Sequence, residues 1–185
     1  TVYTSWVNCN SNTVATSCVT NLYYLNGTNC SLCSDANALA INCTSATVHS
    51  ACASGAYLSG SNLCTACNTV AADWVTCTSN TVATSCASGS YLNGNTCTAC
   101  STVASGWTTC DSATHATSCS NTYFLDAWNC TLCSVHSGWL TCSSGSVALT
   151  CNTANGYYLS AGACLLCTSV HPYLLTCNSP TAHLT

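Results

Sequence analysis

The chain of 185 residues lacks Lys, Arg, Glu, Gln and Met altogether. Its only side-chain carboxylates are those of Asp35, Asp73, Asp111 and Asp126. Without cationic side chains the chain cannot form ion pairs with phosphates, so we expect it to bind neither nucleic acid nor anionic lipid. The four aspartates are isolated in the sequence, so hydrolysis by paired carboxylates has no candidate residues.

Long apolar runs are missing as well. No run approaches the roughly 18 residues that a membrane-spanning helix needs, so the segment has no predicted membrane span. No segment shows the apolar period of an amphipathic helix, whereas short runs of Val, Thr, Tyr and Leu bounded by Gly, Asn and Ser indicate brief strands and turns. The sequence therefore predicts β-hairpins and loops, with little or no α-helix.

Catalytic motifs are also absent. The sequence has no Ser-His-Asp grouping and no G-x-S-x-G motif, and its histidines share no single repeat position. We therefore expect a protein that is not an enzyme and that needs no cofactor, and we interpret the histidines as ordinary loop residues. The histidines are His49, His115, His136, His171 and His183.

What the chain has in abundance is cysteine, with 21 residues. Regularly spaced cysteines at this density persist as pairs only in an oxidising compartment, so we expect an extracellular or cell-surface protein. Four N-glycosylation sequons point the same way and predict attached glycans. Their asparagines are Asn26, Asn29, Asn42 and Asn129.

The cysteines define a tandem repeat. First cysteines recur at steps of 34, 34, 33, 32 and 35 residues, and each repeat follows C-x8-C, then 10 to 12 residues, then C-x2-C. Segments 11–18 and 79–86 are identical. The predicted division is 1–8, the end of a preceding repeat; 9–42, 43–76, 77–109, 110–141 and 142–176, repeats 1 to 5; and 177–185, the start of a further repeat.

Aromatic residues follow the same period. An aromatic-Leu pair lies between the second and third cysteines, and a Trp often lies three residues before a first cysteine. Because each ring keeps a nearly fixed distance from a cysteine, we interpret these rings as packing within the repeats and not as sugar platforms. Asn26-Gly27 and Asn93-Gly94 predict tight turns after the aromatic strand, so each repeat should be a small hairpin plus a loop.

Sequence alone does not determine the disulfide connectivity, because four cysteines per repeat already allow three internal schemes. We favour neighbour pairs, the second cysteine with the third and the fourth with the next first. The alternative interlocks the third cysteine with the next first and the fourth with the next second. The favoured pairs are Cys18 with Cys30, Cys33 with Cys43, Cys52 with Cys64, Cys67 with Cys77, Cys86 with Cys97, Cys100 with Cys110, Cys119 with Cys130, Cys133 with Cys142, Cys151 with Cys164, and Cys167 with Cys177.

This scheme leaves Cys9 alone. Its expected partner is a cysteine directly before Thr1, and a further cysteine is expected directly after Thr185, so we expect a longer array or contacts between neighbouring copies. Zinc is a rival use of the cysteines, because four thiolates could form a tetrahedral site. Against zinc stand the sequons and the absence of the second C-x2-C pair that zinc ribbons usually show.

Residues 23–33 (YYLNGTNCSLC) and 156–167 (GYYLSAGACLLC) carry a family resemblance. They resemble the cysteine-rich repeats of protist surface proteins, namely ciliate immobilisation antigens and variant surface proteins of diplomonads, and the furin-like repeats of growth-factor receptors. The resemblance rests on cysteine spacing and one aromatic-Leu-Gly motif. It implies a surface coat or an extracellular polymer, and this chain departs from those families in lacking Lys and Glu.

The sequence thus predicts small disulfide-rich repeats arranged as an elongated rod. None of the five repeats is distinctive, which favours a structural component of an extracellular filament, appendage or cell-surface coat. Its expected partners are copies of itself and glycans. The alternative is an adhesive or receptor-like extracellular binding array.

Overall fold

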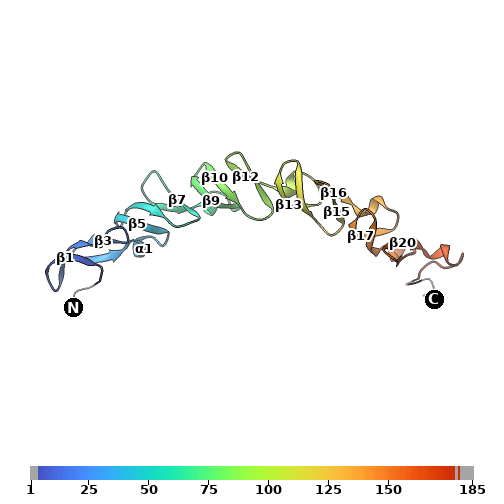
Figure 1. Cartoon of the computed structure of the whole chain (residues 1–185), viewed down its shortest axis with the longest axis horizontal. Coiled ribbons are helices and arrows are strands. Elements are labelled where there is room, and N and C mark those ends of the chain that lie inside the picture. The colour runs from blue at the N-terminus through green and yellow to red at the C-terminus, as the bar shows by residue number, and fades with distance from the viewer. Residues whose placement is uncertain (1–3, 178, 180–185) are drawn as a thin grey trace. The chain divides into compact units, whose positions relative to one another are not determined.

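The computed structural model describes residues 4–177 and residue 179. Every sheet in this part of the chain is an antiparallel pair of strands that follow each other in the sequence (Figure 1). The chain forms two compact units, one of residues up to 87 together with 92–97, the other of residues 88–91 and from 98 onward. The protein therefore consists of small disulfide-rich β repeats, as the sequence predicts.

The first hairpin of each repeat joins the strand that carries the first cysteine to the strand that ends at the second cysteine. Its strands are rich in Val and Thr, which favour extended backbone. The same three shifts in register recur in every copy, so each hairpin is irregular in the same way. The pairs are β1 (Trp6–Ser11) with β2 (Val14–Cys18), β5 (Ala40–Ser45) with β6 (Val48–Cys52), β9 (Trp74–Ser79) with β10 (Val82–Cys86), β13 (Trp107–Ser112) with β14 (His115–Cys119), and β17 (Trp139–Ser144) with β18 (Val147–Cys151).

The sequence predicts one hairpin and one loop in each repeat. That prediction is wrong for the segment between the first and second cysteines, which forms this first hairpin. Its turn is made by a serine two residues after the first cysteine. The hydroxyl oxygen of Ser11 accepts a hydrogen bond from the Thr13 N–H at 3.3 Å, a local side-chain turn. Ser45, Ser79, Ser112 and Ser144 accept the equivalent bond in the other repeats. The S-x-T/S signal was present in the sequence, and it was missed because hydroxyl turns are weaker signals than Asn-Gly.

The second hairpin lies between the second and fourth cysteines. Gly27 and Gly94 have positive φ in its turns, which confirms the two predicted tight turns. The strand pairs are β3 (Tyr23–Asn26) with β4 (Asn29–Leu32), β7 (Ala56–Leu58) with β8 (Cys64–Ala66), β11 (Ser90–Asn93) with β12 (Thr96–Ala99), β15 (Tyr123–Asp126) with β16 (Asn129–Leu132), and β19 (Tyr157–Ser160) with β20 (Ala163–Leu166).

Each fourth cysteine begins a short helical turn, which the sequence analysis did not predict. Three or four residues are too few for an apolar period to be visible. These turns are α1 (Cys33–Ala36) and the 3-10 helices η1 (Cys67–Thr69), η2 (Cys100–Thr102), η3 (Cys133–Val135) and η5 (Cys167–Ser169). A further 3-10 helix, η4 (Thr153–Asn155), precedes β19.

The two hairpins of a repeat are held together by one recurrent backbone hydrogen bond. In repeat 1 the Ala15 N–H donates to the Thr28 carbonyl at 2.8 Å, from the second strand of the first hairpin to the turn of the second. His49, Ala83, Ala116 and Ala148 donate the equivalent bond in repeats 2 to 5. The relative position of the hairpins is therefore set in the same way in each repeat.

A small core lies at each boundary between repeats. In the first unit Tyr24 packs with Ala40 and with the buried Cys33 and Cys43. Tyr57, Trp74, Cys67 and Cys77 form the second such core, and the other unit repeats the arrangement around Tyr91, Phe124 and Tyr158. The first strand begins three residues before the first cysteine, so the cysteine-based boundary of a repeat passes through a strand and through this core.

Gly106 shows how tightly one of these cores is packed. It lies directly before the buried Trp107, has φ +84°, and a Cβ built on it would lie 2.5 Å from the ring of Tyr123. Its carbonyl accepts the Ser120 N–H at 2.8 Å. An alanine here would meet both the strain of the left-handed region and an aromatic ring.

We expect Gly106→Ala to destabilise the core around Trp107 and Tyr123. Left-handed backbone alone costs about 1–2 kcal/mol for a residue with a Cβ, and the ring contact adds to that cost. Hydrogen exchange at the Ser120 amide, which reports on the Gly106 carbonyl, should accelerate at least about tenfold.

Two glycines provide matched controls. Gly94 has positive φ but nothing within 4 Å of the built Cβ, so Gly94→Ala isolates the backbone strain. Gly60 has neither feature, so Gly60→Ala should leave local exchange unchanged. Unaltered exchange at Ser120 in Gly106→Ala would contradict this account of the core.

Candidate functional site

The structure contains ten disulfides, and all are neighbour pairs. The interlocked alternative is wrong. Because these twenty sulfurs are bonded to one another, none of them is a thiolate that could hold zinc. The pairs within repeats are Cys18–Cys30, Cys52–Cys64, Cys86–Cys97, Cys119–Cys130 and Cys151–Cys164. The pairs between successive repeats are Cys33–Cys43, Cys67–Cys77, Cys100–Cys110, Cys133–Cys142 and Cys167–Cys177.

The two kinds of disulfide connect different elements of the fold. A pair within a repeat connects the last residue of the first hairpin to the second hairpin. A pair between repeats connects the helical turn to the next first hairpin, and its fourth cysteine is at most 1% exposed in every repeat. We call this disulfide, together with the aromatic ring packed on it, the joint. In a joint the disulfide lies within an apolar contact. The burial of its fourth cysteine shields the bond from reductants.

Cys9 is the one cysteine outside this framework. It is exposed and unpaired in β1, opposite Ala15. Cys43, the equivalent residue of repeat 2, is buried and bonded to the fourth cysteine of repeat 1. Cys9 therefore occupies, in repeat 1, the position of the first cysteine that in repeats 2 to 5 is bonded to the preceding fourth cysteine in a joint.

The recurrent aromatic residues are core residues, as the sequence analysis interprets them. Trp6, Trp74 and Trp107 are buried, as are Tyr24, Tyr91, Phe124 and Tyr158. Trp139 is half-buried in the joint around Cys133 and Cys142. Among the residues that the structure describes, the exposed rings are instead Trp128 and Tyr173, which do not belong to the repeated pattern.

The sequon asparagines differ in their surroundings. Asn26, Asn29 and Asn129 are exposed, whereas Asn42 is half-buried. With its amide nitrogen turned toward the neighbouring carbonyls, Asn42 donates to Asn21 at 3.1 Å and to Ile41 at 3.0 Å. The Oδ1 atom of Asn129 accepts from the indole N–H of buried Trp107 at 2.8 Å, which leaves the amide nitrogen for a glycan.

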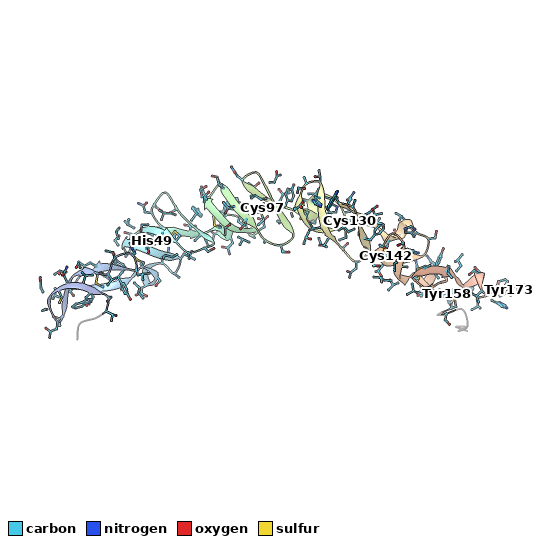
Figure 2. All side chains as sticks on the ribbon, in the orientation of Figure 1. His49, Cys97, Cys130, Cys142, Tyr158 and Tyr173 are labelled. Atoms are coloured by element: carbon cyan, nitrogen blue, oxygen red, sulfur yellow. A yellow bond between two sulfur atoms is a disulfide. The ribbon has the colours of Figure 1, made fainter. Side chains whose placement is uncertain are left out.

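His49 is not a loop residue, which corrects that interpretation. It is 2% exposed and lies in the first hairpin of repeat 2 (Figure 2). Its Nδ1 accepts the Cys64 N–H at 3.1 Å, so the proton of the neutral ring is on Nε2, which has no partner among the described residues. Alanine occupies the equivalent position in the other four repeats. Repeat 2 has room for the ring because five residues separate Leu58 from Cys64, one more than in the other second hairpins.

The other histidines lie apart from one another. His115 is bonded to Asp111, His136 lies against Trp139, and His171 lies near Tyr173. His183 is outside the described residues. Within residues 4–177 and 179, no three side chains of His, Cys, Asp or Glu are grouped as metal ligands.

Tandem hairpins with this many disulfides are those of an extracellular structural or binding protein. No helix in the described residues is long and apolar enough to cross a membrane. The chain matches no protein-family model, and neither a curated protein nor a solved structure is detectably similar to it.

We expect His49→Ala to destabilise repeat 2, because the Cys64 N–H loses its acceptor and the ring leaves a cavity. Together these effects should cost about 2–4 kcal/mol locally. Hydrogen exchange at the Cys64 amide is the measurement. His171→Ala, which removes an exposed imidazole, is the matched control and should have no effect. Equal protection of Cys64 in both variants would show that His49 contributes nothing to the repeat.

Proposed function

We propose that this chain is a glycosylated structural component of an extracellular filament, appendage or cell-surface coat, and that it is not an enzyme. The observation that supports this most strongly is the joint, which recurs at every boundary between successive repeats. A protein that has to carry load or resist proteolysis gains from such a contact, because local opening at a boundary does not separate the repeats.

The stability of the repeats also depends on the disulfides. A unit of about 34 residues buries too little apolar surface to fold alone, so it needs covalent support. Closing loops of 9 to 13 residues contributes roughly 2–3 kcal/mol per disulfide in the chain-entropy account. Such an array can be lengthened by adding repeats without a change in its core, which suits a polymer or a coat.

The surface suits a coat better than a catalyst. One open depression in the second unit is lined by Cys119, Cys142, Tyr123, Leu149 and hydroxyl side chains. Both of these cysteines are in disulfides, so neither is a nucleophile. Asp35, Asp73, Asp111 and Asp126 belong to different hairpins or turns, and among the described residues they take part in no group of three or more potential metal ligands. The resemblance to protist surface repeats adds to this proposal.

Copies of the chain are the expected partners, and Cys9 is the expected point of covalent contact. An exposed thiol in an oxidising compartment is seldom a resting state. All other cysteines of a copy are bonded internally, so two isolated copies can form only one bridge, from Cys9 to Cys9.

On this proposal, chain secreted from an oxidising host should run as a covalent dimer on non-reducing gels, with ten internal disulfides by peptide mapping. Cys9→Ser should abolish the covalent species, whereas Val7→Ser, a change at an exposed neighbour in β1, should leave it intact. Electron microscopy of the source material should show this chain in filaments or a surface layer. Native material that is monomeric, with Cys9 reduced, would refute the structural role.

Glycan occupancy provides a separate prediction. We expect attachment at one or more of Asn26, Asn29 and Asn129, and the lowest occupancy at Asn42, because its amide is engaged by two carbonyls. Glycopeptide mass spectrometry of secreted chain measures all four sites. Bare asparagines throughout would remove glycosylation from the proposal.

A further inference from the structure

Repeat 4 differs from the other repeats at three positions. Asp111 follows the first cysteine, where the other repeats have Asn10, Thr44, Thr78 and Ser143. His115 lies four residues later, where all the others have valine. Trp128 provides the turn carbonyl that links the two hairpins, where the others have Thr28, Asn62, Asn95 and Gly162. These changes leave the cysteines and the recurrent aromatic residues unaltered. They nevertheless make repeat 4 distinctive, which corrects the expectation that no repeat is.

The three side chains meet on one surface. His115 Nδ1 lies 3.0 Å from Asp111 Oδ2 across the turn of the first hairpin. The imidazole of His115 packs edge-to-face on the indole of Trp128, with ring centroids 3.7 Å apart and an interplanar angle of 79°. Residues far apart in the sequence are thus joined into one contiguous group, which we call the repeat-4 cluster.

Two contacts hold Trp128 in place although it is 61% exposed. Its carbonyl accepts the Ala116 N–H at 2.8 Å, and its ring rests on His115. The next residue, Asn129, is held by the Trp107 indole and by the Cys130 N–H. A large ring is therefore presented to solvent on a fixed backbone and not on a free loop. Such exposure of an indole costs solvation free energy without any benefit to the core.

We propose that the repeat-4 cluster is a binding site for a pyranose sugar. The apolar C–H face of a pyranose can cover the exposed indole and remove its surface from water. The Asp111 carboxylate, 56% exposed and paired with the His115 imidazole at 3.0 Å, accepts hydrogen bonds from the hydroxyls of the sugar. His115 contacts both partners, so it orients the carboxylate and the indole toward the same ligand. One apolar platform with a few polar groups at its edge is the arrangement that small-molecule recognition requires.

A sugar fits this cluster better than a cation does. Recognition of quaternary ammonium cations uses a cage of several rings around the charge, and Trp128 is a single exposed indole. One Asp111 oxygen is already engaged by His115 Nδ1 at 3.0 Å, which leaves fewer oxygen atoms to coordinate a cation. Neither argument applies to a neutral ligand whose hydroxyls donate hydrogen bonds to acceptors such as the Asp111 carboxylate.

The sugar can come from two sources. Asn129 begins a sequon and directly follows Trp128, so a glycan on Asn129 could fold back onto the indole. Alternatively, the site binds a glycan of another molecule. The chemistry is the same in both cases, and the site does not depend on the proposed structural role.

Thr131→Val separates the two sources, because it removes the sequon while Asn129 keeps its bonds to Trp107 and Cys130. With this variant, methyl glycosides of N-acetylglucosamine, glucose, mannose and galactose are titrated by NMR, following the Trp128 indole N–H and the backbone amides of His115 and Ala116, which remain as reporters in Trp128→Ala. We expect saturable shifts with at least one of them. Trp128→Ala should weaken binding at least about tenfold and Asp111→Asn about threefold or more.

Tyr173→Ala is the matched control, since Tyr173 is an exposed ring of the same unit that has a histidine neighbour but no carboxylate beside it (Figure 2). It should leave binding unchanged. In glycosylated wild-type chain, contact with the attached sugar should shift the N-acetyl methyl resonance of the Asn129 glycan upfield, and Trp128→Ala should abolish that shift.

Either a bound glycoside or the shifted glycan resonance supports the site and identifies its source. Absence of both effects overturns it, as does a glycoside affinity that Trp128→Ala leaves within about twofold of the original. Binding of tetramethylammonium with no binding of any pyranose would also overturn it, by assigning the cluster to a cation.

Discussion

The fold depends on the disulfide between a fourth cysteine and the next first cysteine, buried under an aromatic ring. Neither part would suffice alone. The rings of one repeat have too little apolar surface around them to form a core, and a disulfide without packing would only shorten a loop. Combined, they make each boundary between repeats the best-buried place in the chain, with fourth cysteines that are at most 1% exposed. The hairpins on either side are held to these boundaries, and their surfaces expose many Val and Leu side chains among the hydroxyl-bearing ones.

This arrangement separates stability from surface chemistry. Residues of the joint recur in every repeat, with an aliphatic residue, Ala40 or Leu174, in place of Trp at two of the boundaries. Residues away from the joint are free to vary, and they do so in two informative places. Repeat 2 buries His49 where the others have alanine, and it accommodates the ring with one extra turn residue. Repeat 4 builds the cluster of Asp111, His115 and Trp128 on its surface. A scaffold of this kind can therefore keep one covalent design while single repeats acquire binding properties.

Glycans connect the proposed structural role with the proposed sugar site. The chain has almost no charge with which to interact with its surroundings, so hydroxyls, amides, exposed rings and exposed aliphatic side chains are the groups that its surface offers, together with the sugars that the proposed function adds. A coat built from copies that carry glycans and also bind pyranoses would have sugar-mediated cohesion in addition to the covalent contact at Cys9. Because Cys9 and the repeat-4 cluster are different features, the two kinds of contact can be lost separately.

The sequence by itself determined the period and the class of fold, because cysteine spacing, ring spacing and Asn-Gly turns are local signals. It favoured the neighbour pairing, but only the structure excluded the interlocked scheme. It also contained the serine turns of the first hairpins, but weakly, since a hydroxyl turn competes with many other uses of Ser and Thr. Only the tertiary structure decided which polar residues are buried and which meet. His49 resembles any loop histidine until the second hairpin closes over it, and Asp111, His115 and Trp128 become one site only because a backbone bond brings the turns of two hairpins together. Such proximity comes from the packing of hairpins, which no spacing in the sequence encodes.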